Sequence, residues 1–417
     1  MEFDVSGESV VAIFGKRGSG KSYTLGVLAE ALCTLQPISD IGTCSRQKGV
    51  LLLDTLNVFW STENPLSTET DRKRFPVETS RMNSWHLRPT ALDVEVWIPK
   101  GFRSPHTPDH YSDFAIPTSE LTSDDLADLF DIDSQRDLIG QLLAEVREKT
   151  SALTSEFSFG DMVGVLEADD EIRNYYAEAT IRAARQRLRS MSQVPLFAST
   201  GGTPLRDLLR PGRLSVLELG EVPNSLRTVV TSVLLRRIHS ERARASDAEK
   251  QLALNTRLST EERGRLKQYL EGALPPSWVM VDEAQNILPA DRAVKSSDAV
   301  VRFVREGRNF GLSFALTTQQ PAAVDARILA QTDTVICHKL TVANDIARMR
   351  DNMKCPEPLE VKAGGRELDL AAWLRSLDLG HAVVTNADSE RLFALELRPR
   401  ICPHGGTGFR PQVTVDG

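Results

Sequence analysis

The stretch Gly15–Ser22 has the sequence GKRGSGKS, and the fold expected for this chain follows from it. The stretch matches the pattern G-x-x-x-x-G-K-S/T, in which glycines let successive backbone N–H groups converge on the phosphates of a nucleotide. In such a loop the lysine, here Lys21, neutralises phosphate charge, and the next hydroxyl, here Ser22, is a ligand of Mg²⁺. The stretch therefore predicts a site for ATP and Mg²⁺.

The sequence on both sides of the loop favours a strand–loop–helix unit over a glycine-rich turn that matches by chance. Ser9–Phe14 is a nearly continuous apolar run, typical of a strand buried on both faces of a parallel sheet. Apolar residues after the loop recur at helical spacing, so a helix should point its N-terminus at the anion. The residues expected to line the nucleotide site are Gly15, Lys16, Arg17, Gly18, Ser19, Gly20, Lys21, Ser22 and Tyr23.

The composition is that of an ordinary globular protein, with 417 residues of which 41% are hydrophobic and 26% charged. The sequence has no signal peptide and no run near the ~20 apolar residues of a membrane span, so a cytoplasmic location is expected. The net charge of −7 argues against a uniformly basic nucleic-acid coat but leaves room for a basic pore. The five cysteines form no C-x-x-C pair, and we expect reduced thiols at Cys33, Cys44, Cys337, Cys355 and Cys402.

Further apolar runs alternate with helical patterns and predict a parallel α/β sheet. These runs are Gly49–Asp54, Asp93–Ile98 and Leu214–Leu219, whereas residues 60–92 lack periodicity and are expected to form a loop. Asp54 ends its strand on the edge where such sheets bind ligands. It could orient a Mg²⁺-bound water, hold a neighbouring loop, or serve as an ordinary strand-terminal cap.

Two segments look like additions to this sheet. The first spans residues 120–200, begins with a helix-start signal at Thr122–Asp125 and continues as helical patterns. These patterns cover Leu126–Phe130, Gln135–Lys149 and Asp169–Met191, and the last of them carries Arg182, Arg185, Arg187 and Arg189. Those arginines could line a nucleic-acid path or form a solvated, salt-bridged face. The second segment, Ala245–Glu271, is polar and is expected to be a surface insertion with a helix start at Ser259–Glu262.

The run Trp278–Glu283 is the second chemical signal, because this apolar strand ends in two adjacent carboxylates. Alone, the pattern is more often a strand end than a site. With the loop at residues 15–22, Asp282 is expected to hold the Mg²⁺ shell, and Glu283 to polarise the water that attacks the γ-phosphate.

The strand expected at Leu312–Gln319 ends in polar residues that could sense the γ-phosphate. Gln319 is the predicted sensor, because an amide can both donate to phosphate and accept from water. Arg308, just upstream, is either an arginine finger or a charge that favours a helix C-terminus. We expect the sensor and the arginine on the same sheet edge, with the site completed by a neighbouring subunit.

These segments together resemble the HerA/FtsK superfamily of hexameric DNA-pumping ATPases, and HerA most closely. The likeness rests on Gly15–Ser22, Val281–Glu283, Glu306–Gly311 and Thr318–Pro321, and on the tail Arg398–Gly406. The resemblance implies a RecA-like P-loop NTPase core, a ring of six, ATP between subunits and double-stranded DNA through the centre. Residues 1–119 and 201–397 would form this core, residues 120–200 an inserted helical subdomain, and residues 398–417 a C-terminal tail.

One departure concerns the partner. HerA proteins usually carry an N-terminal β-barrel that docks a nuclease, whereas only fourteen residues precede Gly15. The expectation is a shortened bacterial relative that works with a separately encoded nuclease or other effector in defence or DNA processing.

Three functions are compatible with these patterns. The first is an ATP-driven double-stranded DNA translocase, the second a nucleotide-gated ring scaffold without pumping, and the third a conjugative-secretion-type motor. Glu283 argues against the scaffold, since a pure switch can lose its water-activating carboxylate. The lack of a membrane segment argues against the secretion motor.

Overall fold

The computed structural model describes residues 7–33, 48–64, 66, 68–87, 92–290, 297–356, 358, 361–363 and 366–406. Cys44 and residues 407–417 of the expected tail lie outside these ranges. None of the helices in these ranges combines the length and the apolar character that a membrane span requires.

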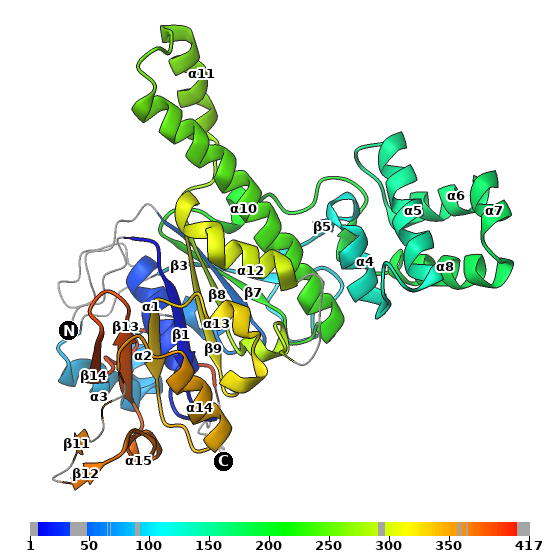
Figure 1. Ribbon diagram of the computed structural model, residues 1–417. Helices are drawn as coiled ribbons and strands as arrows, with labels where there is room; N and C mark the ends of the chain where they lie inside the picture. The colour runs from blue at the N-terminus through cyan, green and yellow to red at the C-terminus, as the bar shows by residue number, and fades with distance from the viewer. Residues whose placement is uncertain are drawn as a thin grey trace, which may run out of the picture.

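A ten-stranded sheet forms the centre of the described chain, in the order β14-β13-β10-β1-β9-β8-β2-β7-β3-β4 (Figure 1). All neighbours from β10 to β4 are parallel, and only the pairs β10–β13 and β13–β14 are antiparallel, because β13 runs against the other strands. The mainly parallel α/β sheet predicted from the sequence is therefore confirmed. The strands are β1 (Val10–Phe14), β2 (Gly49–Asp54), β3 (Asp93–Pro99), β4 (Ser112–Phe114), β7 (Arg213–Glu218), β8 (Ser277–Val281), β9 (Leu312–Thr318), β10 (Thr334–Cys337), β13 (His381–Asn386) and β14 (Arg391–Glu396).

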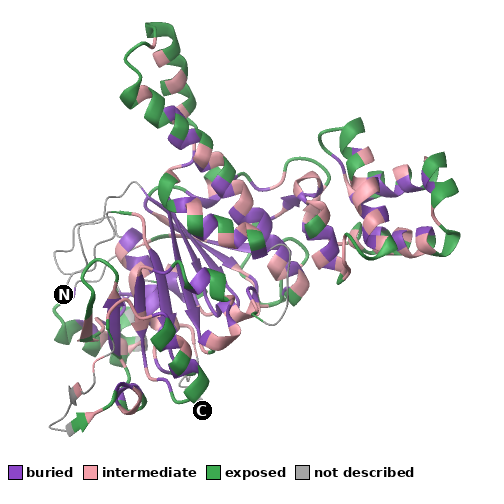
Figure 2. Cartoon of the chain, in the orientation of Figure 1, coloured by how far each residue is buried: buried purple, intermediate pink, exposed green. Residues whose placement is uncertain are grey.

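Helices cover both faces of the sheet, which explains why β1, β2, β8 and β9 are buried at every position and are mostly apolar. Alternate residues of a strand point to opposite faces. Val11 and Ile13 pack toward α1 (Lys21–Cys33). Ala12 and Phe14 belong to the other core, with α10 (Asn224–Leu254) and α12 (Ser297–Glu306). Figure 2 shows the resulting buried centre.

Shorter elements surround the sheet. They are β5 (Ile116–Pro117), β6 (Phe197–Ala198), β11 (Val361–Ala363), β12 (Arg366–Leu368), α9 (Leu205–Leu208), α13 (Ala326–Leu329), α14 (Ala343–Asp351) and α15 (Leu370–Ser376).

A group of helices stands to one side of the sheet in Figure 1. It comprises α4 (Ser123–Phe130), α5 (Leu138–Leu153), α6 (Phe159–Ala168), α7 (Asp170–Tyr175) and α8 (Glu178–Met191). The single helix expected at Asp169–Met191 is two helices, because the backbone is extended at Tyr176 and Ala177. On α8, Arg185 and Arg189 both pair with Glu167, over 3.0 and 2.8 Å, so these two arginines form part of a salt-bridged face.

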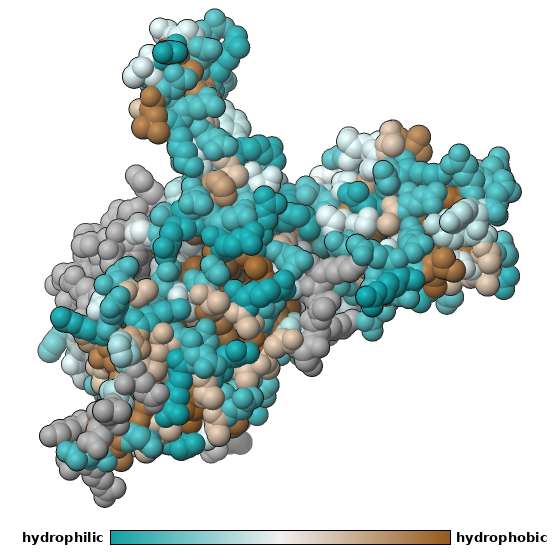
Figure 3. Space-filling view, viewed as in Figure 1, coloured by the Kyte–Doolittle hydropathy of each residue, from teal (hydrophilic) through white to brown (hydrophobic). Residues whose placement is uncertain are grey.

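The surface insertion expected at Ala245–Glu271 is a helical arm, and its first part is the continuation of α10. α10 continues to Leu254 and forms an arm with α11 (Thr260–Glu271) that projects from the sheet and is largely hydrophilic on the face in Figure 3. The helix continues because buried Arg242 anchors it, donating to the carbonyl oxygens of Leu274 and Phe310 over 2.7 and 2.9 Å. The helix start predicted at Ser259–Glu262 is confirmed as a capping box.

The loop expected at residues 60–92 is also a wrong prediction. Its described part contains a 3₁₀ helix at Trp60–Glu63 and two helices, α2 (Glu69–Arg74) and α3 (Pro76–Ser84). Pro76 sits at the first helical turn, where a proline is tolerated. Met82 is the one buried residue of α3, so no apolar period marks this helix in the sequence.

Candidate active site

The loop Gly15–Ser22 joins β1 to α1, as its flanking sequence predicted. The backbone N–H of Gly15 donates to a carbonyl at the end of β9 over 3.3 Å, and that of Lys16 to one just past β10 over 2.8 Å. Gly18 and Gly20 have φ angles of 72° and 111°, which L side chains rarely adopt. Of the nine residues expected to line the site, Gly15, Ser19 and Lys21 are buried, Gly20, Ser22 and Tyr23 are half-buried, and Lys16, Arg17 and Gly18 are exposed.

Lys21 lies between the loop and the end of β8. Its buried Nζ is 3.3 Å from the carbonyl oxygen of Lys16 and 3.5 Å from Oε1 of Glu283. Burial lowers the pKa of Lys21, and the charge of Glu283 opposes that shift. A buried ammonium in this position is suited to receive a phosphate.

Asp282 is brought next to Ser22, although 260 positions separate them in the chain. The Ser22 hydroxyl donates to Oδ1 of Asp282 over 2.9 Å, and the Thr317 hydroxyl donates to the same oxygen over 2.7 Å. Oδ2 of Asp282 is buried and has no hydrogen-bond partner among the described residues. Burial, together with the charge of Asp54, raises the pKa of Asp282 to about 7.

This donor set fits Mg²⁺. The ion prefers oxygen ligands and usually takes only one or two from the protein, with phosphate and water completing its octahedron. The unpartnered carboxylate oxygen of Asp282 and the hydroxyl of Ser22 supply such ligands. No cluster of three or more acidic, cysteine or histidine side chains within the described ranges offers a metal site of its own.

Glu283 follows β8 in a left-handed backbone conformation, with φ 53° and ψ 60°. Its buried carboxylate accepts hydrogen bonds from the side chains of Gln319 and Gln285, over 2.6 and 2.8 Å. The backbone N–H of Gln319 adds a third contact of 3.3 Å. Gln319, the predicted sensor, is therefore hydrogen-bonded directly to Glu283, the predicted water-activating residue.

Gln285 was not among the residues predicted from the sequence. Its amide oxygen accepts from the Thr318 hydroxyl over 2.8 Å while its NH₂ group holds Glu283. Gln285 thus connects the ends of β8 and β9. Its place two residues after Glu283 is the only signal the sequence offers for this role.

Asp54 holds a loop, which was one of three interpretations left open. Its carboxylate accepts from the backbone N–H groups of Leu56, Val58 and Phe59, over 3.1, 2.7 and 2.7 Å. Burial raises its pKa to about 7 despite these bonds.

Tyr23 faces the C-terminal tail. Its hydroxyl accepts from the backbone N–H of Arg400 over 2.6 Å, and its ring meets that of His404 edge-on at 5.8 Å. A contact between Tyr23 and nucleotide stays a prediction.

Arg308 lies on the opposite edge of the sheet, so the expectation that it shares an edge with Gln319 is wrong. It pairs with Asp333 at 2.5 Å, and Asp333 also accepts from the N–H of Val10, at the amino end of β1. The reason is topological. In the chain, α12 comes directly before β9 and packs on one face of the sheet. The short connection between them, which includes Arg308, therefore lies at the amino end of β9, where the parallel strands begin.

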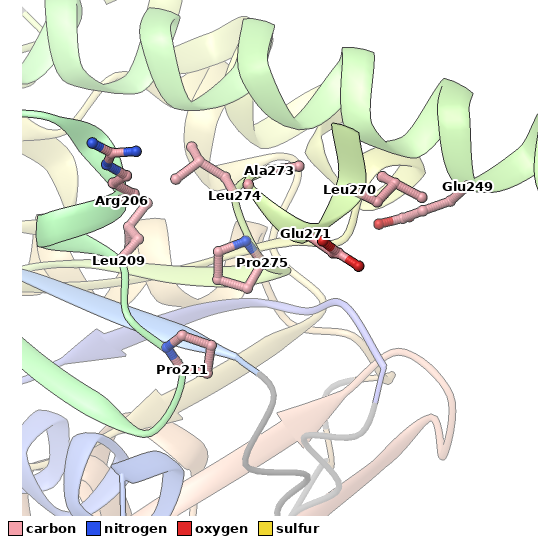
Figure 4. A pocket seen from close by; sticks show the side chains of 10 residues that line it. Arg206, Leu209, Pro211, Glu249, Leu270, Glu271, Ala273, Leu274 and Pro275 are labelled. Atoms are coloured by element: carbon pink, nitrogen blue, oxygen red, sulfur yellow. The ribbon is translucent and has the colours of Figure 1, made fainter. Parts of the chain in front are cut away.

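A separate cavity of about 460 Å³ lies at the base of the α10–α11 arm (Figure 4). Arg206, Leu209 and Pro211 line one side, and Glu249 of α10 and residues 270–275 the other. It borders the amino ends of β7 and β8, so it is distinct from the site around Lys21.

Fold and site together define an ATPase of the RecA-like P-loop NTPase class. Residues 8–238 match the family model described as the central domain of helicase HerA. Since this match covers more than half of the chain, the protein belongs to the HerA helicase family, as its sequence resemblance indicated.

Curated relatives are consistent with this assignment. The chain is 25% identical over 275 residues to a protein of Methanocaldococcus jannaschii described as a probable helicase, a match that covers 63% of this chain and 47% of that protein. It is 22% identical over 258 residues to the DNA double-strand break repair helicase HerA of Pyrococcus furiosus, a match that covers 56% of this chain and 47% of that protein. The chain spans about half the length of these relatives.

Solved structures confirm the fold. The bacterial conjugative coupling protein TrwB aligns with a TM-score of 0.51 at 13% identity, over 95% of this chain and 89% of TrwB. VirB4 of Thermoanaerobacter pseudethanolicus aligns with a TM-score of 0.51 at 12% identity, over 93% of this chain and 89% of VirB4. One TrwB structure contains ADP and Mg²⁺.

Proposed function

We propose that this chain is the ATP-hydrolysing subunit of a hexameric ring that translocates double-stranded DNA. The observation that carries the proposal is the cluster of buried Lys21, Asp282 and Glu283 with half-buried Ser22 at one sheet edge. The HerA relatives, one of them described as a DNA double-strand break repair helicase, support DNA as the substrate.

The proposed chemistry assigns each group a task. The loop N–H groups and Lys21 hold the β- and γ-phosphates, and Ser22 and Asp282 hold Mg²⁺, which offsets phosphate charge when bound. Glu283 accepts a proton from the attacking water, so that ATP and water become ADP and phosphate. Gln319, which donates to Glu283, can turn its amide toward the γ-phosphate.

Arg308 would act on a neighbour's nucleotide. It is 59% exposed and lies at the edge where the strands begin, whereas the loop Gly15–Ser22 lies where β1 ends. A head-to-tail contact joins two different surfaces and can close into a ring. We propose that such a contact brings Arg308 to the next subunit's γ-phosphate, where it stabilises transition-state charge. A structural pair with Asp333 is the alternative.

The proposal extends to organisation and context. Residues 1–119 and 201–397 form the ATPase core, residues 120–200 an inserted helical subdomain and residues 398–417 a tail. The ring works in the cytoplasm with a separately encoded nuclease or other effector, in bacterial defence or DNA processing.

DNA-stimulated hydrolysis tests the proposed function. Purified protein with ATP and Mg²⁺ should release phosphate several-fold faster when linear double-stranded DNA is added. The Lys21→Ala variant, assayed alongside, should show no turnover with or without DNA. A wild-type rate that DNA leaves unchanged favours the nucleotide-gated scaffold or the secretion-type motor.

A further inference from the structure

His338 fills the space beneath the loop Gly15–Ser22. It is the first residue after β10, is fully buried, and donates its backbone N–H to the carbonyl oxygen of Phe14 over 2.8 Å. A Cβ atom at Gly15 would lie 2.8 Å from the Cβ of His338. A Cβ atom at Gly20 would lie 3.4 Å from Cε1 of its ring. The loop therefore closes around this side chain.

Both ring nitrogens of His338 have defined partners. Nδ1 lies 3.0 Å from the carbonyl oxygen of His381, which can only accept, so Nδ1 carries the proton. Nε2 lies 2.7 Å from Oγ1 of Thr24 and accepts from that hydroxyl. Burial lowers the pKa of His338 to about 4, and the nearby charge of Lys21 adds to the shift, so the ring is neutral at pH 7.

Thr24 carries this contact into the phosphate-binding loop. Its backbone N–H donates to the carbonyl oxygen of Gly20 over 2.9 Å, and its hydroxyl lies 3.0 Å from the same oxygen. While Nε2 of His338 accepts the hydrogen bond of the Thr24 hydroxyl, the Gly20 carbonyl oxygen accepts from the backbone N–H of Thr24. The Thr24 hydroxyl thus lies between the His338 ring and the Gly20 carbonyl oxygen and links the ring to the loop.

We propose that His338 is a positioning residue, which fixes the phosphate-binding loop through its contact with Thr24. The inference rests on the proposed ATP site and adds to it a residue that contacts neither phosphate nor metal. Its physical basis is preorganisation, because a loop that already holds its N–H groups in place loses less entropy when phosphate binds.

Matched substitutions separate the two ring contacts. His338→Gln keeps a polar atom near the position of Nε2, and so the contact with Thr24, but gives up the bond to His381. His338→Asn keeps an N–H for His381 but is too short to reach Thr24. Thr24→Val removes the hydroxyl at nearly constant shape, and Thr24→Ser retains it. His106→Asn, on an exposed loop, is the surface control.

The measurement is the Kd of a fluorescent ATP analogue with Mg²⁺, together with kcat and KM for ATP. His338→Asn and Thr24→Val should each weaken binding about tenfold and raise KM, with kcat changed less than about twofold, since one buried hydrogen bond is lost in each. The double variant should bind no more weakly than either single variant. His338→Gln, Thr24→Ser and the control should bind like wild type.

Two results would overturn the inference: wild-type affinity in His338→Asn and Thr24→Val, or effects that multiply in the double variant. If His338→Asn fails to fold, as judged by thermal melting without nucleotide, Thr24→Val against Thr24→Ser decides the question. Failure of the wild type to bind the analogue contradicts the proposed function itself and is therefore distinguishable.

Discussion

At the scale of one residue, Glu283 has a strained backbone conformation and a side chain that hydrogen bonds hold in place. A left-handed backbone costs an L-residue about 1–2 kcal/mol, and the surrounding bonds must maintain it. The N–H of Glu283 donates to the Thr317 hydroxyl over 2.9 Å, and two glutamine side chains hold its carboxylate. Its position is fixed before any nucleotide arrives.

Substitutions at Lys21 and Glu283 should therefore have different effects. Lys21→Ala removes the charge that meets phosphate and should weaken ATP binding by about tenfold or more. Glu283→Gln keeps shape and hydrogen bonding but cannot take a proton, so ATP should bind normally while kcat falls about 10²–10⁴-fold. Equilibrium binding and phosphate release measure the two effects. Equal loss of binding in both variants would count against the role of Glu283.

His338 also predicts a pH dependence. Its folded pKa of about 4 lies below the ordinary value of 6.5, so the unfolded chain binds the proton more readily between these values. The stability that the neutral ring contributes is present above pH 6.5 and is lost as pH falls toward 4.

Urea unfolding at pH 7 and pH 5 measures this loss. Between these values wild type should lose about 2 kcal/mol more unfolding free energy than His338→Gln, which has no ring to protonate. Identical losses in the two proteins would show that the ring protonates as readily when folded as when unfolded.

At the scale of elements, the tail holds the helix that begins in the phosphate-binding loop. Glu30 of α1 is fully buried and accepts from Arg398 over 2.9 Å and from Arg400 over 3.0 Å. Burial would raise the pKa of Glu30, but the charges of the two arginines outweigh it and lower the pKa. The described part of the tail, residues 398–406, is thus anchored on α1 through Arg398 and Arg400.

Neutralising Glu30 should be costly. Glu30→Gln leaves two guanidinium groups without a charged partner, and breaking such a buried pair costs about 3–5 kcal/mol of unfolding free energy. Glu69→Gln, in an exposed pair with Lys73, is the matched control and should cost less than about 1 kcal/mol. Denaturant midpoints measure both. Similar small losses would mean that the tail is dispensable for stability.

The sequence pattern predicted those helices and strands whose buried residues recur at a regular spacing or form a continuous apolar run. β1, β2, β8 and β9 were predictable because each is buried throughout and mostly apolar, and because carboxylates stand at the end of β2 and directly after β8. α3 was not, because it buries a single side chain, and the length of α10 was not, because a buried arginine anchors its polar half.

The site was predictable in its chemistry and less so in its supports. Motif spacing indicated Lys21, Ser22, Asp282 and Glu283, which the fold brings together. The contact of His338 with Thr24 joins residues 314 positions apart, and no local pattern announces it. The edge on which Arg308 lies depends on how α12 crosses the sheet, which spacing alone does not define.

At the scale of the whole molecule, the two sheet edges carry different parts of the proposed machinery. The loop, Asp282, Glu283 and Gln319 lie where the parallel strands end, and Arg308 lies where they begin. A chain with two different functional edges is suited to head-to-tail assembly. In a closed ring, each subunit's Arg308 edge contacts the ATP-site edge of its neighbour, so that no edge is left without a partner.

Assembly should be visible as mass. Six copies of a 46.1 kDa chain give a particle of ~280 kDa, as a closed cyclic ring requires. Mass photometry of wild type with ATP, Mg²⁺ and DNA should find this species. Monomers alone under these conditions would rule out the ring.

The central claim is that hydrolysis needs two subunits, with Arg308 of one serving the Glu283 of the next. Arg308→Ala alone should fold and assemble but lose about 10³-fold or more in turnover, whereas loss of a helix-end charge costs only about 0.3–1 kcal/mol of stability. Arg308→Ala and Glu283→Gln subunits should each be inactive when assayed separately.

The most direct measurement is ATP hydrolysis after the two inactive variants are mixed in equal amounts and allowed to assemble together. About one quarter of the junctions then pair an intact Glu283 with an intact Arg308, so turnover should recover to as much as about a quarter of the wild-type rate for independent sites. A mixture as inactive as its components, in rings shown by mass to contain both, would contradict the claim.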